Sequence, residues 1–179
     1  MKSTTAKYGT VAVAIHWLSA ILIFAMLGSG FRAASTVDAE AKASILTVHA
    51  TFGVMILVLT LARAAWWMFA DRKPDQPAGG PRWQAASAKA VHALFYVVIL
   101  GMAASGIGMM VLSGAAAVVF GGAEAPLPDF WDYAPRVPHG LGARAMLALL
   151  VLHIGAALYH HFFLKDRLIR KMWFGEPNP

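Results

Sequence analysis

One apolar stretch near the C-terminus carries four histidines and decides the fold: His139-Gly-Leu-Gly-Ala-Arg-Ala-Met-Leu-Ala-Leu-Leu-Val-Leu-His153-Ile-Gly-Ala-Ala-Leu-Tyr-His160-His161. At about 100° per residue, His139 and His153 fall about 40° short of four full turns apart, so both leave one helix face. Their separation along the axis is about 21 Å, within a bilayer core about 30 Å thick. A histidine in lipid is either hydrogen-bonded between helices or functional. Two histidines on the same face of one helix, one toward each membrane surface, favour two cofactor sites stacked along the bundle.

The composition is that of a membrane protein. Of the 179 residues, 59% are hydrophobic and 13% are charged, and the mean hydropathy is +0.60. An ordinary soluble domain has about 25% charged residues. The net charge of +6 is no signal for nucleic acid, because most charges lie in loops at one membrane face. The absence of cysteine excludes disulfides, thiolate-ligated haem, cysteine-held iron–sulfur clusters and covalent haem attachment.

Four apolar segments are each long enough to span a bilayer, at about 9–31, 43–69, 84–113 and 139–164. They use most of the chain, so we predict one domain over residues 1–179. The predicted fold class is all-α, an integral membrane four-helix bundle. We expect loops at 32–42, 71–82 and 121–138 and a short basic amphipathic tail after residue 164.

The Lys and Arg residues predict the orientation. The N-terminal segment, the 63–89 connection and the tail hold all of them except Arg32, Lys42, Arg136 and Arg144. Because cytoplasmic loops carry the excess of Lys and Arg, we expect both termini in the cytoplasm.

Depth in the membrane then sorts the histidines. His49 and His139 lie toward the external side and form the one pair available there. On the cytoplasmic side His153 needs a partner, which depth alone leaves open between His16 and His92.

Facing histidines in a four-helix core match haem best. Two imidazole ligands leave iron no open coordination position, so such an iron carries electrons. No Asp or Glu lies within any predicted span, which weighs against a di-iron site. The small residues Gly101, Ser105 and Gly108 form a stripe that indicates either room for a flat cofactor or ordinary helix packing.

Several motifs resemble the bacterial cytochrome b561 family along nearly the whole chain. They are Ile15-His16-Trp17-Leu18, Val48-His49 with Gly53 and Arg63, His92 with Tyr96, and His139…His153…His160-His161-Phe162-Phe163-Leu164-Lys165-Asp166. The chain is most similar to the stand-alone form, whose characterised members are dihaem superoxide:ubiquinone oxidoreductases of the bacterial cytoplasmic membrane. This resemblance implies one haem b between His16 and His153 and another between His49 and His139.

Most of the remaining polar residues have two interpretations. His160, on nearly the same face as His153, is either a hydrogen-bond or proton donor to ubiquinone or an interfacial histidine bonded to a backbone carbonyl. His161 is expected at the interface, and His92 beside a ligand or the quinone. Arg63, Lys89 and Arg144 either pair haem propionates or snorkel to the interface.

We therefore expect a membrane enzyme that takes electrons from superoxide outside and passes them to ubiquinone. The predicted external surface has a formal charge of −1, so the anion needs a local approach, for which Arg136 and Arg144 beside His139 are the candidates. One alternative is the cytochrome b subunit of a larger complex, as in hydrogenases or formate dehydrogenases, which needs a partner protein. Another is a non-redox membrane protein with incidental histidines.

Overall fold

The computed structural model describes residues 2–74, 81–123, 126–166 and 168–174, which are mostly helical and contain no strand. Arg167 and Glu124, which enter the charge balance above, lie outside the described residues. The long helices are α1 (Thr10–Ser35), α2 (Ala39–Ala65), α3 (Arg82–Leu112) and α5 (Arg136–Tyr159). Two π-helical turns, η1 (Trp66–Ala70) and η3 (His160–Leu164), continue α2 and α5. The short elements are α4 (Ala115–Val119), η2 (Phe130–Asp132) and α6 (Leu168–Lys171).

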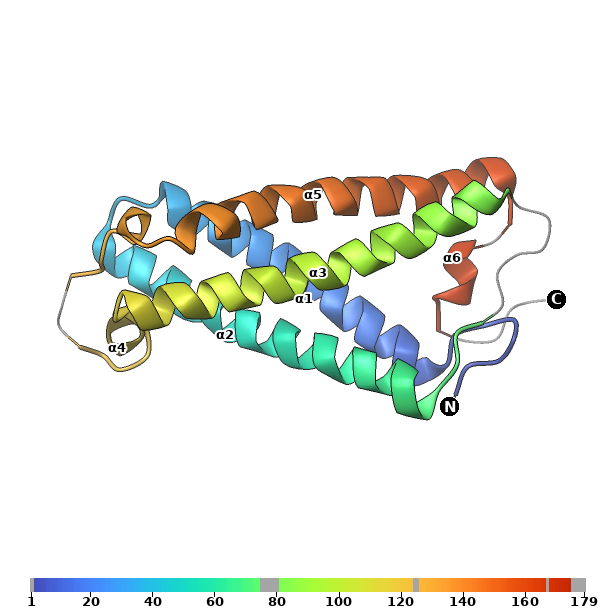
Figure 1. Ribbon diagram of the computed structural model, residues 1–179, viewed down its shortest axis with the longest axis horizontal. Helices are drawn as coiled ribbons and strands as arrows, with labels where there is room; N and C mark the ends of the chain where they lie inside the picture. Colours follow the sequence, from blue (N-terminus) through green and yellow to red (C-terminus); the bar gives the residue numbers. More distant parts are fainter. Residues whose placement is uncertain (1, 75–80, 124–125, 167, 175–179) are drawn as a thin grey trace.

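Four of these helical segments are long and apolar enough to cross a membrane: Thr10–Ser35, Ala39–Ala70, Arg82–Leu112 and Arg136–Leu164. They form the expected all-helical bundle (Figure 1). Helix α1 packs along α2, α3 packs along α5, and α2 joins the two pairs through its contact with α3. The bundle therefore consists of two helical hairpins, α1–α2 and α3–α5.

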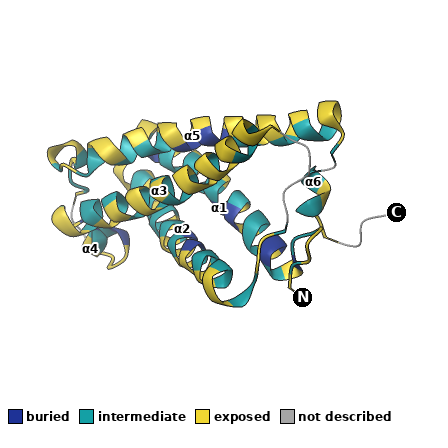
Figure 2. Ribbon diagram, turned by 45° about the vertical axis from the view of Figure 1, so that its right-hand side comes forward, coloured by how far each residue is buried: buried dark blue, intermediate teal, exposed yellow. Residues whose placement is uncertain are grey.

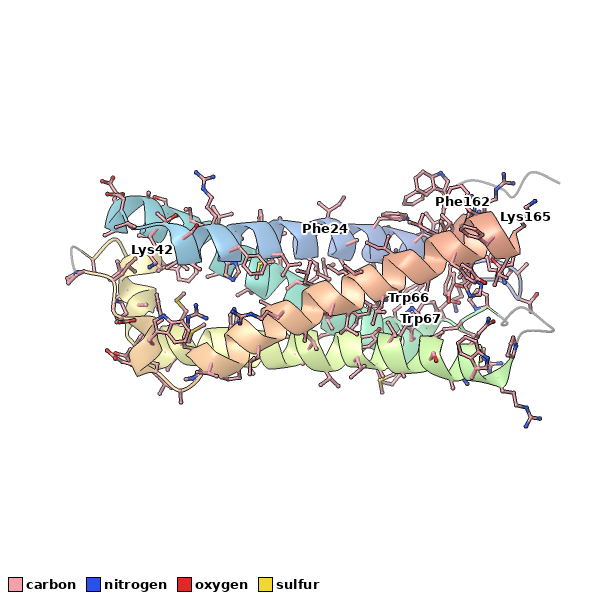
Figure 3. The ribbon with its side chains drawn as sticks, turned by 90° about the horizontal axis from the view of Figure 1, so that it is seen from above. Phe24, Lys42, Trp66, Trp67, Phe162 and Lys165 are labelled. Atoms are coloured by element: carbon pink, nitrogen blue, oxygen red, sulfur yellow. The ribbon has the colours of Figure 1, made fainter. Side chains whose placement is uncertain are left out.

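The two ends of the bundle differ. At one end, here the α6 end, the Trp17 indole donates to the Met172 carbonyl at 2.8 Å and the Tyr8 N–H to the Lys171 carbonyl at 3.3 Å. At the opposite end, here the α4 end, the Thr47 hydroxyl lies 2.8 Å from the Val119 carbonyl. Figure 3 shows Lys42 toward the α4 end, with Trp66, Phe162 and Lys165 toward the α6 end.

A hydrogen-bonded tie holds the N-terminal segment at the α6 end. The Ser3 hydroxyl and N–H donate to the Asp71 carboxylate at 2.8 and 3.0 Å. Partial burial raises the pKa of this carboxyl, but the hydrogen bonds from Ser3, the Arg72 N–H and the Trp66 indole outweigh it and lower the pKa. The ionised form of Asp71 therefore fastens the start of the chain to the end of η1.

Few side chains are fully buried, as expected for a bundle that faces lipid (Figure 2). The buried apolar residues are Ala12, Val13, Leu22, Ala33, Ile56, Ala115, Val119, Met146, Leu149 and Leu150. Most large side chains along the outer faces are exposed, which is the correct arrangement where the solvent is hydrocarbon.

The predicted loops were partly wrong. Most of 32–42 is helical, and only Thr36–Asp38 connects α1 to α2, because the Asp38 carboxylate accepts the Ala41 N–H at 2.8 Å and begins α2 early. Helix α3 ends at Leu112 because Gly114 adopts a left-handed conformation with φ 69°. That turn permits α4, which we did not predict. Within 121–138, η2 and the first turn of α5 were also missed.

Candidate functional site

Two histidines face each other at the α4 end. His49 of α2 and His139 of α5 have ring centroids 6.1 Å apart, and their ring planes are nearly perpendicular. Both rings are half-buried. We call them the α4-end pair. The pairing of a residue from each hairpin is what the depth argument predicted for these positions.

Both rings of the α4-end pair are held at Nδ1. Ser29 of α1 lies 3.0 Å from His49 Nδ1, and Ser105 of α3 lies 3.0 Å from His139 Nδ1. The Met102 carbonyl is 3.1 Å from the same His139 nitrogen. A carbonyl can only accept, so His139 Nδ1 carries the proton and Nε2 keeps its lone pair.

Three histidines gather toward the α6 end. His153 of α5 lies between His16 of α1 and His92 of α3, with centroid distances of 6.3 and 5.4 Å. We call these three the α6-end cluster. The structure thus brings both candidate partners to His153. No other described residue hydrogen-bonds to the rings of His16 or His153, whereas His92 Nδ1 donates to the Ala88 carbonyl at 2.6 Å.

A half-buried arginine accompanies the α6-end cluster. Arg63 lies close enough to His16, His92 and His153 to act on each electrostatically. Its Nε is buried and has no hydrogen-bond partner among the described residues. An unpaired buried guanidinium nitrogen is costly, so this position suits an anionic ligand group. Lys89, another candidate for that role, is exposed on α3.

His160 contacts a carboxylate rather than the carbonyl that one interpretation expected. Its Nδ1 hydrogen-bonds to Asp166, where the chain turns after η3 through Lys165 at φ 55°. The neighbouring His161 has a buried Nδ1 without a partner among the described residues. The α6 end therefore combines a histidine–carboxylate pair with exposed aromatic side chains such as Phe162.

Two arginines flank the first turn of α5. The Arg136 guanidinium lies over the Trp131 ring, 4.4 Å from its centroid. Arg144 donates to the Gly140 carbonyl at 3.1 Å. A Cβ at Gly140 would lie 3.0 Å from Arg136 Nη1 and 3.6 Å from Arg144 Nη1. Both positive charges therefore converge on the residue that follows His139.

The sequence and its relatives now identify the family. A family model described as prokaryotic cytochrome b561 matches residues 7–175. This protein belongs to the prokaryotic cytochrome b561 family. It is a multi-pass protein of the bacterial inner membrane that transfers electrons, and it is of the oxidoreductase type.

Several curated relatives match along almost their whole length. Cytochrome b561 homolog 2 of Escherichia coli strain K12 is 28% identical over 178 residues, covering 95% of this chain and 93% of that protein. A probable superoxide oxidase, CybB of Yersinia pestis, is 26% identical over 170 residues, covering 93% and 95%. Cytochrome b562 of Cereibacter sphaeroides is 27% identical over 172 residues, covering 92% and 94%.

Membership in the cytochrome b561 family implies haem b, and the residues present fit this group. Two imidazoles that would hold one metal between them, each with a ring nitrogen about 2.0–2.1 Å from it, would need ring centres roughly 6 Å apart. The His49–His139 and His16–His153 centroids, at 6.1 and 6.3 Å, match this separation. The His92–His153 distance of 5.4 Å is shorter than both.

Sequence reasoning missed part of the site. It placed Ser105 in a stripe of small residues without a specific partner, and it did not single out Ser29 or Asp166 as contacts of histidines. A signal was present, because Met26-Leu-Gly-Ser29-Gly30 and Met102-Ala-Ala-Ser105-Gly106 share one pattern.

Proposed function

We propose that this cytochrome b561 holds two haems b and oxidises superoxide at the α4 end while reducing ubiquinone at the α6 end. The observation that carries the proposal is the pair of histidine–histidine separations near 6.3 Å, one toward each end of the bundle. When bound, the haems supply one-electron redox chemistry without an open coordination position. The α4 end faces outward in this proposal and the α6 end faces the cytoplasm.

His16 and His153 are the proposed ligands at the α6 end. The centroid distance favours His16 over His92, and the free ring nitrogens of His16 and His153 leave both rings available to iron. The buried Arg63 Nε, near all three histidines, is the proposed partner of a haem propionate. A charge-assisted hydrogen bond there would satisfy a nitrogen that the protein leaves unpaired.

Arg136 and Arg144 are the proposed attraction site for superoxide. Both guanidinium groups converge on Gly140, directly beside the proposed ligand His139. The Trp131 ring holds the Arg136 guanidinium in place. Such local positive potential offsets the formal negative charge expected at this face and can raise association rates by about 10- to 1000-fold. The relative from Yersinia pestis that is named a probable superoxide oxidase supports the choice of substrate.

His160 with Asp166 is the proposed proton-delivery site for ubiquinone. The carboxylate orients the imidazole, and both groups are half-buried at the α6 end. The balance of the reaction is simple. Two superoxide anions each lose one electron and leave as O2, and ubiquinone takes up the two electrons and two protons to become ubiquinol.

The test uses the purified holoprotein under anaerobic conditions. Superoxide should reduce the b-type absorbance rapidly, at a rate that falls as ionic strength rises. The double variant Arg136→Ala with Arg144→Ala should flatten the salt dependence and retain both haems. Arg32→Ala is the matched control, because it removes an exposed cation at the same end that lies on the other hairpin.

The outcomes separate the alternatives. If superoxide reduces neither haem although both are present, the protein is better explained as the electron-transfer subunit of a larger complex. If the arginine variants keep the full salt dependence, the attraction site lies elsewhere. If the purified protein has no haem spectrum, the redox function itself is wrong.

A further inference from the structure

The two hairpins carry the same local arrangement around the α4-end pair. In the α1–α2 hairpin, Ser29 contacts His49, and a Cβ at Gly30 would lie 3.0 Å from Cε1 of that ring. The Met26 side chain of the same helix reaches the next turn of α2, where a Cβ at Gly53 would lie 3.4 Å from its Cε. One short Met-x-x-Ser-Gly segment thus supports the histidine from its own hairpin.

The α3–α5 hairpin repeats this arrangement. Ser105 contacts His139, and a Cβ at Gly106 would lie 3.3 Å from Cε1 of that ring. The Met102 side chain lies beside Gly142, where a Cβ would come within 2.7 Å of its Cγ. Because α1 packs along α2 as α3 packs along α5, the two histidines are presented to each other by equivalent supports (Figure 1).

The serine hydrogen bonds have a defined direction. Each hydroxyl donates to the carbonyl three residues earlier, Ser29 to Met26 at 3.2 Å and Ser105 to Met102 at 3.0 Å. A hydroxyl has one proton, so its oxygen can then only accept from the imidazole. The Met102 carbonyl on the same nitrogen fixes the proton of His139 at Nδ1, and the matching bond from Ser29 to Met26 favours the same tautomer for His49, with the Nε2 lone pairs free.

We infer that Ser29 and Ser105 form a duplicated cradle that fixes the α4-end pair as Nδ1–H tautomers and sets its strength as a ligand. The inference rests on the proposed function, since it concerns the haem between His49 and His139. A hydrogen bond from Nδ1–H makes an imidazole a stronger donor to the metal. Stronger donors favour ferric iron, so the cradle lowers the reduction potential at the α4 end.

The α6 end has no such cradle. No described residue hydrogen-bonds to the ring of His16 or His153, so neither ring receives the same support. The cradle therefore makes the two haems unequal. Removing the hydroxyls should change one potential and leave the other unchanged, which a general loss of packing would not do.

The test is a potentiometric titration of the holoprotein and of Ser29→Ala, Ser105→Ala and the double variant. Each single variant should keep both haems and shift the α4-end potential to more positive values, and the double variant should shift it further. Loss of the α4-end haem to an apoprotein acceptor should become about 10- to 100-fold faster in the double variant. Ser35→Ala is the matched control, because the Ser35 hydroxyl also donates to the carbonyl three residues earlier but contacts no histidine.

Threonine substitutions complete the design. Ser29→Thr and Ser105→Thr retain a hydroxyl and should return the potential toward that of the parent protein. An unchanged α4-end potential in the single and double alanine variants overturns the inference, as does an equal shift in Ser35→Ala.

If His49→Ala removes one haem and the serine variants have no effect, the inference alone fails. If His49→Ala leaves two haems, the proposed function fails with it. Should the double variant not assemble, the single variants decide.

Discussion

Replacing Gly30 by alanine separates the effect on the histidine from the effect on the helix. The added Cβ would lie 3.0 Å from His49 Cε1 and 3.5 Å from its Nδ1. Ordinary van der Waals contact begins near 3.4 Å, so the ring must retreat by a few tenths of an ångström. The Ser29–His49 hydrogen bond, 3.0 Å long, is strained by the same movement.

The helix itself gains from this change. Glycine in a helix interior is less favourable than alanine by about 1 kcal/mol. Gly30→Ala should therefore not lower the melting temperature through helix propensity. It should instead weaken binding of the α4-end haem, by about 10- to 100-fold if the displaced ring behaves like a ligand that has lost its hydrogen-bonded support.

Two other glycines, one on α1 and one on α3, serve as comparisons. Gly28→Ala is the matched control, because a Cβ there meets nothing within 4 Å and the gain in helix propensity is the same. Gly106→Ala should have a smaller effect than Gly30→Ala, since its Cβ would lie 3.3 Å from the His139 ring. The assay is the haem-to-protein ratio of the pure protein, with thermal unfolding followed by circular dichroism. Equal haem content in the Gly28 and Gly30 variants would refute the reasoning.

Three further predictions concern the α6 end. His16→Ala should remove one of two haems and His92→Ala neither, as measured by the haem-to-protein ratio; the reverse pattern would reassign the ligand. His160→Ala should keep both haems but slow their reoxidation by ubiquinone, by about 100-fold if proton transfer limits the step, and unchanged kinetics would make the residue structural. The pKa of the Asp71 carboxyl is lowered from its ordinary value of 3.8. The hydrogen-bonded tie between Ser3 and Asp71 is therefore fully formed above pH 3.8 and is lost as the pH falls through the lowered pKa. Hydrogen exchange at residues 3–9 should rise on that acidification, and in Ser3→Ala it should already be high at neutral pH.

The spans were predictable because a bilayer imposes a length and excludes charge. The uncharged runs around His16, His49, His92 and His153 all lie in long helices. Helix ends were less predictable, because they depend on single interactions such as the cap formed by Asp38. The end of α3 agrees with the predicted span, which ended at 113, whereas the short helix α4 that follows the left-handed turn at Gly114 was not predicted.

The pairing of His49 with His139 followed from depth alone, because that side of the membrane offers no third histidine within the spans. The serines that hold the pair could not be predicted with the same certainty. A serine in a membrane helix bonds its own backbone, a neighbour or lipid headgroups according to the rotation of the helix. Helix rotation is set by packing, as in the contact of Met26 with Gly53, and hydropathy does not report it.

In the α6-end cluster, the distances between the histidine rings distinguish two residues that depth in the membrane leaves equivalent. His92 and His16 lie at similar depth, but their ring centroids lie 5.4 and 6.3 Å from that of His153, and the longer separation is the one that we propose for two ligands of one haem. The Nδ1 of His92 donates to the Ala88 carbonyl, which leaves its Nε2 as an acceptor close to the His153 ring. The rings of His92 and His153 meet edge to face, and the printed hydrogen bond of His92 goes to its own helix, so His92 does not give His153 the support that Ser105 gives His139.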